Sequence, residues 1–238
     1  MNKSYRKPAT ALLLVAIATT VLWTTGASLA QRGEGRRPPR PGGGEKPEIE
    51  DTLRLNVYAD NWFSLYINGE LVAVDSIRFM PHNVISVDVF PKYPMTLAVI
   101  AKDNADAKTG MEYNNTQIGD GGFILKLADG TVTGPHWKAK SVSYGPIDRD
   151  TRNPRVVHEE LPENWFAIDF DDSSWQAAKA YDEQTVRPKR PFYQYDFEGA
   201  KFIWADDLEL DNTVLFRLTV DSPPDGSQPK RFPILESN

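Results

Sequence analysis

Residues 59–70 read Ala59-Asp60-Asn61-Trp62-Phe63-Ser64-Leu65-Tyr66-Ile67-Asn68-Gly69-Glu70. In a strand, successive side chains point to opposite faces. One face of this predicted strand therefore carries Phe63, Leu65 and Ile67, and the other carries Trp62, Ser64 and Tyr66. An Asn-Gly pair between two alternating runs is the strongest short signal of a β-hairpin. With Leu71 to Val74 as the second strand, the pattern predicts a hairpin with one face in the core and the other available as a platform.

Other short runs carry the same period of two, and turn pairs such as Asp129-Gly130 separate them. No segment has the period of a long amphipathic helix. This pattern predicts an all-β fold, an antiparallel β-sandwich or jelly roll with short helical turns and long loops. Asp169 to Trp175 is predicted to be one such helical turn. The further predicted strands are Leu53 to Val57, Ile85 to Val89, Met95 to Ala101, Gly122 to Leu127, Val132 to Ser143 and Thr213 to Val220.

Four regions follow from composition. Residues 1–30 have three cations, an apolar run and small residues before Ala30, which is typical of a secretory signal peptide. Residues 31–50 form a Gly-, Pro- and Arg-rich linker that is expected to be disordered, residues 51–220 form the β-sandwich, and residues 221–238 form a Pro-rich tail. We therefore expect a secreted or periplasmic protein with no membrane span after cleavage of the signal. An uncleaved membrane anchor is the alternative.

Charge and cysteine content narrow the function classes. The chain contains no cysteine, which excludes disulfides, thiol catalysis and Cys-ligated metal centres. Without the predicted signal it carries 24 basic and 33 acidic residues, a formal charge of −9. Because phosphate binding depends on clustered Lys and Arg, nucleic acid is not an expected partner.

Motifs for catalysis are incomplete. His158-Glu159-Glu160 begins like a zinc-protease helix, but Pro162 stands where the second His is required. The acidic run from Asp206 to Asp211 lacks the central glycine and the final glutamate of a calcium-binding helix loop. We therefore predict a protein that is not an enzyme.

The loop after the strand Met95 to Ala101 is rich in carboxylate and amide side chains. Calcium takes six to eight oxygen ligands from such groups. Asp103, Glu112 and Asp120 are the first candidates to hold a structural calcium ion, the only cofactor that the sequence suggests. The alternative is that these residues shape turns, as Asp commonly does.

A sugar site needs an exposed aromatic face beside carboxylates or amides. Trp62 and Tyr66 are the candidates for stacking, and Trp137, Trp165, Trp175 and Trp204 are instead expected to be buried. The predicted ligand-binding residues are Asn61, Trp62, Tyr66, Asp103, Glu112 and Tyr113.

Several runs in order resemble the galactose-binding-like β-sandwich superfamily. They cover nearly all of residues 51–220 and are 59–63, 66–69, 122–130, Trp137, Trp165, 169–175, 202–204 and 214–217. The likeness is to non-catalytic modules of bacterial glycoside hydrolases such as rhamnosidases, and to secreted bacterial proteins of unknown role. The resemblance implies a binding module and permits a structural calcium ion.

The sequence is compatible with two functions. The first is a secreted, non-catalytic module that binds neutral carbohydrate. The alternative is a structural or assembly protein that docks another secreted or envelope protein. A sugar site predicts exposed aromatics beside carboxylates, whereas a docking surface predicts a broader apolar patch.

Overall fold

The structure is a computed structural model that describes residues 45–75 and 83–232. The predicted signal peptide and most of the predicted linker lie outside these residues. The described domain is all-β, with 39% strand and 7% helix, and its sheets are antiparallel. The predicted β-sandwich is thereby confirmed. Within residues 45–75 and 83–232, the structure contains no helix with the length and apolar composition that a membrane span requires.

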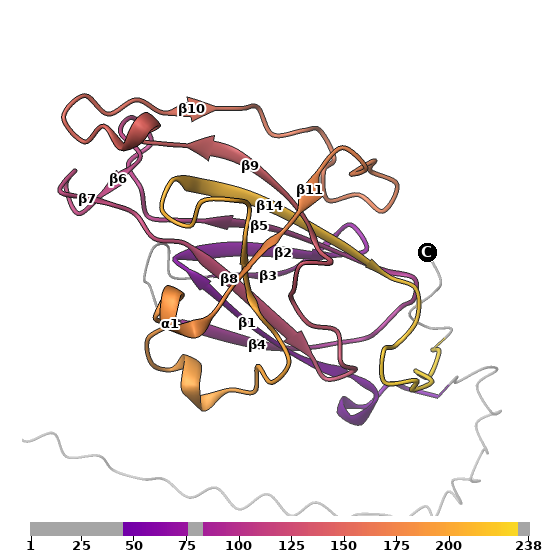
Figure 1. The fold of residues 1–238 in the computed structure, drawn as a ribbon. Helices are drawn as coiled ribbons and strands as arrows, with labels where there is room; N and C mark the ends of the chain where they lie inside the picture. The colour runs from indigo at the N-terminus through magenta and orange to yellow at the C-terminus, as the bar shows by residue number, and fades with distance from the viewer. Residues whose placement is uncertain (1–44, 76–82, 233–238) are drawn as a thin grey trace, which may run out of the picture. The chain divides into compact units, whose positions relative to one another are not determined.

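Two sheets form the two layers of the sandwich (Figure 1). In spatial order, the first contains β12 (Lys179–Tyr181), β13 (Phe202–Trp204), β8 (Gly122–Leu127), β1 (Leu53–Asp60) and β4 (Val84–Val89). The second contains β10 (Val157–His158), β9 (Lys138–Tyr144), β14 (Asp211–Val220), β5 (Met95–Lys102), β2 (Trp62–Ile67) and β3 (Glu70–Val74), with β11 (Gln176–Ala177) also paired to β9.

Short elements fill the connections between these strands. A two-stranded hairpin pairs β6 with β7, and one short α-helix and three 3-10 turns complete the described chain. Their bounds are β6 (Met111–Glu112), β7 (Gln117–Ile118), α1 (Glu183–Val186), η1 (Ile49–Asp51), η2 (Ile147–Arg149) and η3 (Phe192–Gln194).

The core between the sheets is built by strand alternation. Leu97 and Val99 of β5 and Val214 and Phe216 of β14 point into it, and their neighbours in sequence point to the other face. Phe216 stacks on Phe123 of β8, with ring centroids 5.4 Å apart. The alternating pattern in β2 is confirmed, because Phe63, Leu65 and Ile67 all belong to this core.

The outer face of the second sheet is covered by residues 163–175, which we call the covering segment. Its Trp165 and Trp175 are buried against Ile100 of β5 and Leu215 of β14 in a second apolar cluster. Arg217 of β14 is buried beneath the segment and donates to the Trp165 and Ala167 carbonyl oxygens at 2.6 and 3.0 Å. The second sheet therefore has apolar packing on both faces.

Two predicted elements are corrected. The predicted strand Val132 to Ser143 is interrupted. Val132 forms an isolated bridge with Lys126, and the strand β9 (Lys138–Tyr144) begins six residues later. Gly134 and Pro135 lie in the turn between them, which the Trp137 N–H closes by donating to the Gly134 oxygen. Asp169 to Trp175 is a pair of turns rather than a helical turn. Asp171 does accept a backbone bond there, from the Ser173 N–H at 2.9 Å.

The ends of the described domain are held by contacts with each other. Lys230 forms ion pairs with Glu45 and with Asp51 of η1, and Phe232 is buried with its ring edge-on to Phe90. The structured domain therefore starts within the stretch that the sequence predicts to be a linker.

Candidate functional site

Strand order brings four carboxylates to one end of the sandwich. The chain crosses from the first sheet to the second between Asp60, the last residue of β1, and Trp62, the first of β2. Asp60 pairs with Gly122, just after Asp120, and Trp62 pairs with Lys102, just before Asp103. Asp60, Asp103 and Asp120 therefore meet where the sheets are joined. The crossing from β1 to β2 is at the left of Figure 1.

Asn61 connects this crossing to Asp103. Its side-chain N–H donates to Asp60 Oδ1 at 2.6 Å, and its Oδ1 accepts from the Asn104 N–H at 2.6 Å. The same Asn104 N–H donates to Asp103 Oδ1 at 2.5 Å. Asp60, Asn61 and Asp103 are all buried, so their positions are fixed by these bonds.

The β6–β7 hairpin adds the fourth carboxylate and an aromatic ring. Glu112 is buried at the end of β6, and Tyr113, the next residue, is 64% exposed. Tyr113 has φ +48°, and the turn is closed by bonds from Thr116 to the Glu112 and Tyr113 carbonyl oxygens. A bulky side chain rarely adopts a positive φ, so the surrounding turn holds Tyr113 in place.

Three carboxylates are close enough to share one cation. Asp103, Glu112 and Asp120 each offer an oxygen, and these atoms lie within 4.8 Å of one another. Asp103 and Glu112 are buried, whereas Asp120 is exposed. The three residues that the sequence suggested as calcium ligands are thus brought together.

Burial and mutual repulsion raise the pKa values of three carboxylates in this cluster. Burial, followed by the charges of Asp120 and Glu112, raises the pKa of Asp60 to about 7, and Lys189 opposes the shift. Burial, followed by Glu112 and then Asp120, raises the pKa of Asp103. Burial and the Asp120 charge raise the pKa of Glu112, and the interaction with Asp103 opposes that shift. The Glu112 charge raises the pKa of Tyr113, as do the other three carboxylates to a smaller extent. The Tyr113 phenol therefore lies within the field of all four.

Lys189 acts on this cluster through its charge and also lines a concave surface. This lysine, whose charge acts on Asp60, also lines an open pocket of about 340 Å³. Exposed Tyr193 lines the same pocket, together with Arg187 and Glu183.

The predicted stacking residues Trp62 and Tyr66 lie on the outer face of the second sheet. Phe166 of the covering segment stacks on Tyr66 at 4.6 Å between ring centroids, and Trp165 packs edge-on against it. Trp62 donates from Nε1 to the Asp75 oxygen at 3.0 Å, and the Lys102 ammonium lies 5.7 Å from its ring centroid. One face of the Tyr66 ring is thus occupied by the protein itself, and Trp62 is partly buried.

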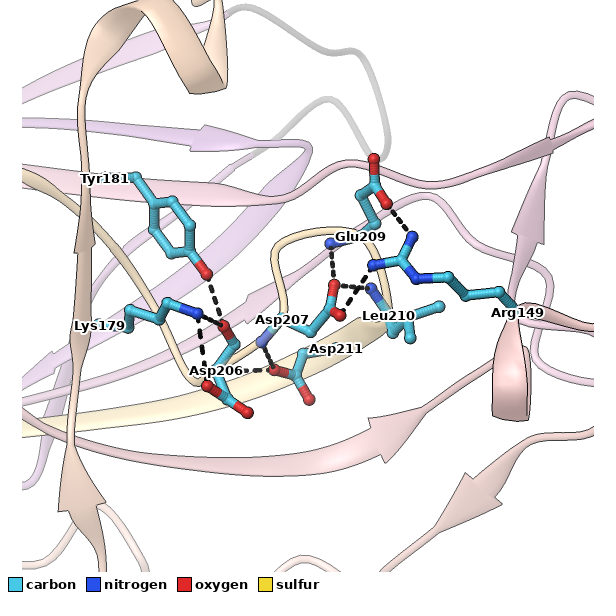
Figure 2. Close-up of polar contacts among 8 residues, drawn as sticks. All are labelled: Arg149, Lys179, Tyr181, Asp206, Asp207, Glu209, Leu210 and Asp211. Carbon is cyan, nitrogen blue, oxygen red and sulfur yellow. Dashed lines mark hydrogen bonds and ion pairs between the residues drawn. The ribbon is translucent and has the colours of Figure 1, made fainter.

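A second acidic group, in the loop before β14 and at the first residue of that strand, differs from this cluster because its carboxylates are hydrogen-bonded and paired with a cation (Figure 2). Asp211 Oδ2 accepts from the Asp206 and Asp207 N–H groups at 2.9 and 2.8 Å, and Arg149 pairs with both Asp207 and Glu209. These carboxylates shape a turn and neutralise a cation. They are not candidates for a ligand site.

Sequence reasoning located most of the site but missed two of its residues. Asn61, Asp103, Glu112, Tyr113 and Asp120 were predicted and lie together. Asp60 and Lys189 were missed. The signal for Asp60 was its place at the end of an alternating strand, next to Asn61, whereas nothing local in the sequence links Lys189 to this end.

The chain matches no protein-family model, no curated protein and no solved structure with which it was compared.

Proposed function

We propose that the domain is a secreted, non-catalytic binding module for neutral carbohydrate, with its site at the joined end of the sandwich. The observation that carries this proposal is the exposed ring of Tyr113 beside four carboxylates. An aromatic face packs on the C–H side of a pyranose, and carboxylates accept hydrogen bonds from pairs of hydroxyl groups. The proposal transfers the stacking role from Trp62 and Tyr66 to Tyr113.

The pocket beside Lys189 supports a ligand of sugar size. Its volume of about 340 Å³ is in the range of small-molecule sites. Exposed Tyr193 offers a second ring there, and Lys189, which also lines the pocket, acts on Asp60 through its charge. Such a shallow, wet site is expected to bind with micromolar or weaker affinity.

Exposed apolar side chains occur on several elements of the domain. Ile49 belongs to η1, Leu71 to β3 and Ile168 to the covering segment, and Phe90 follows β4. A docking surface is a broad apolar patch, whereas a sugar site needs an exposed ring beside carboxylates, and Tyr113 meets that second requirement. Docking of another secreted protein remains the second candidate, to be adopted if carbohydrates do not bind.

The test is calorimetric titration of the purified protein with a panel of neutral oligosaccharides, in EDTA and again in calcium. We expect binding of one sugar class, weakened about tenfold in Tyr113→Ala, since loss of an aromatic contact removes roughly 1.4 kcal/mol. Tyr195→Ala, which removes another exposed tyrosine ring, is the matched control and should bind normally. The proposal would be rejected if no sugar bound at millimolar concentration. It would also be rejected if Tyr113→Ala bound the sugar as tightly as the unmodified protein does.

A further inference from the structure

Three carboxylates at the joined end come from different points of the connection between β5 and β8. Asp103 follows β5, Glu112 lies in β6, and Asp120 precedes β8. Their nearest oxygens are mutually within 4.8 Å. Asp60, buried at the end of β1, is a fourth acid at this end, and Asn61 joins it to the Asn104 N–H beside Asp103. Groups of like charge repel one another at this spacing, and either a cation or a proton among them relieves the repulsion.

One oxygen of Asp103 accepts no hydrogen bond from the residues that the structure describes. Asp103 is only 4% exposed, and its Oδ1 accepts from the Asn104 N–H. Its Oδ2 is buried, and no residue in the described part of the chain hydrogen-bonds to it. Buried carboxylate oxygens without a donor are rare, because their desolvation is not compensated. This oxygen is therefore free to bind a cation or to share a proton with Glu112.

The chain makes room for that oxygen at Gly119. A Cβ atom placed on Gly119 would lie 1.8 Å from Asp103 Oδ2. Oδ2 is thus directed at the turn that carries Asp120, the next residue. The close approach of this turn to Asp103 requires a residue without a side chain.

From these observations we propose that Asp103, Glu112 and Asp120 bind one calcium ion. All three donors are carboxylate oxygens, which suit a hard cation and not zinc or copper. Calcium–oxygen distances are about 2.3–2.6 Å, so oxygens on opposite sides of the ion lie roughly 5 Å apart, which accommodates the observed spacing. Magnesium requires shorter and more regular bonds. Asp120 is exposed, so the ion exchanges with solvent and completes its coordination with water.

The competing explanation is a proton held between Asp103 and Glu112. A proton would also relieve the repulsion, but the protein would then bind no calcium, and calcium would not change its Tm. The two explanations therefore predict different responses to the ion itself.

The test uses the full protein stripped with EDTA and then titrated with calcium chloride or magnesium chloride at equal ionic strength and neutral pH. We expect one calcium ion per chain by calorimetry and a rise in Tm, because the ion binds only the folded state. Magnesium should give a smaller rise. Asp120→Asn should weaken calcium binding by about tenfold or more. Asp120 is exposed, so this variant should fold normally, and circular dichroism checks that it does.

The matched control is Glu70→Gln, which also removes one negative charge. Glu70 begins β3 and pairs with Ile67, the last residue of β2, whereas Asn61 precedes the first residue of β2. Glu70 therefore lies at the other end of that strand from the carboxylate cluster. This variant should bind calcium as the unmodified protein does. A loss of affinity equal to that of Asp120→Asn would mean that net charge, and not the site, governs binding, and would overturn the proposal.

Terbium luminescence provides a second readout at the site. Terbium replaces calcium and is excited through a nearby aromatic ring, here Tyr113. We expect emission that calcium displaces and that Asp120→Asn greatly reduces. No heat, no rise in Tm and no terbium emission at millimolar ion would overturn the proposal, as would an equal rise in Tm with both ions and in both variants. None of these measurements uses a sugar, so failure here is distinct from failure of the carbohydrate proposal.

Discussion

Arg217 is the residue that fixes the covering segment to the second sheet. Its side chain is 2% exposed, yet its guanidinium contacts four groups of the segment. It pairs with Asp172 at 2.9 Å, donates to the Trp165 and Ala167 carbonyl oxygens, and lies 5.2 Å from the Phe170 ring centroid. A buried cation is tolerated only when its N–H groups are satisfied in this way.

Replacing this cation should loosen the segment. We expect Arg217→Met to lower the free energy of unfolding by about 2 to 4 kcal/mol, because the two carbonyl oxygens and Asp172 lose a charged donor. Arg54→Met is the control, since Arg54 pairs with Asp88 at an exposed position and should cost below about 1 kcal/mol. Urea denaturation followed by tryptophan fluorescence measures both. Similar losses in the two variants would show that Arg217 does not anchor the segment.

The connection from β5 to β8 depends on close approaches of the backbone. Gly119 faces Asp103, and a Cβ on Gly121 would lie 2.5 Å from the Trp204 ring. The β6–β7 turn has three consecutive residues of positive φ, Tyr113, Asn114 and Asn115. Asparagine tolerates this conformation, which explains two of the three positions. The connection is thus built to place Glu112 and Asp120 beside Asp103.

A methyl group at Gly119 should disturb this arrangement. In Gly119→Ala the new Cβ would overlap Asp103 Oδ2, and the Asp103 side chain cannot move freely because it is buried and bonded to Asn104. We expect a loss of stability above about 1 kcal/mol in EDTA and a smaller calcium-dependent rise in Tm. Gly199→Ala is the comparison, since it has open space and bears only the strain of φ +82°, about 1 kcal/mol. An unchanged Tm in Gly119→Ala would contradict the close approach.

The domain combines two apolar clusters with a buried acidic end. Strands β5 and β14 contribute to both clusters, with Val99 and Phe216 on the inner face and Ile100 and Leu215 on the outer face. These contacts support the burial of Asp60 and Asp103, which is unfavourable when the carboxylates are ionised. Stability of the domain should therefore depend on the protonation of its acidic end.

In EDTA, stability should fall as pH rises from about 4 to about 7. The Asp60 pKa is about 7 in the folded protein and 3.8 without the fold, so the folded state binds more protons across this window. The free energy of unfolding therefore decreases with pH there and levels off above the folded pKa. Carboxyls with lowered pKa, such as Asp171 and Asp182, act in the opposite direction only as pH falls below their usual value.

Urea titrations over this pH range provide the measurement. Asp60→Asn should flatten part of the slope, because the amide does not titrate, while Asp103 and Glu112 retain the rest. Stability that rises between pH 4 and 7 in EDTA would contradict the buried acidic cluster.

Local patterns in the sequence were sufficient for the fold class and for much of the site. Alternation and the Asn-Gly turn predicted β2 and β3, because side-chain direction in a strand repeats every two residues. The same reasoning failed at residues 132–137, where Gly134 and Pro135 interrupt the strand. Asp103, Glu112 and Asp120 were predicted together since they lie in one connection of the chain.

Contacts between distant parts of the chain could not be predicted in this way. The pattern of β2 indicated that Tyr66 lies opposite the core residues, but not that Phe166, a hundred positions later, stacks on it. Nor did it reveal that Asp60 joins the acidic cluster, or that Lys189 acts on Asp60. Alternation reports which face a side chain is on, whereas what covers that face depends on how loops and sheets pack in space, and that packing is determined by the folded chain as a whole.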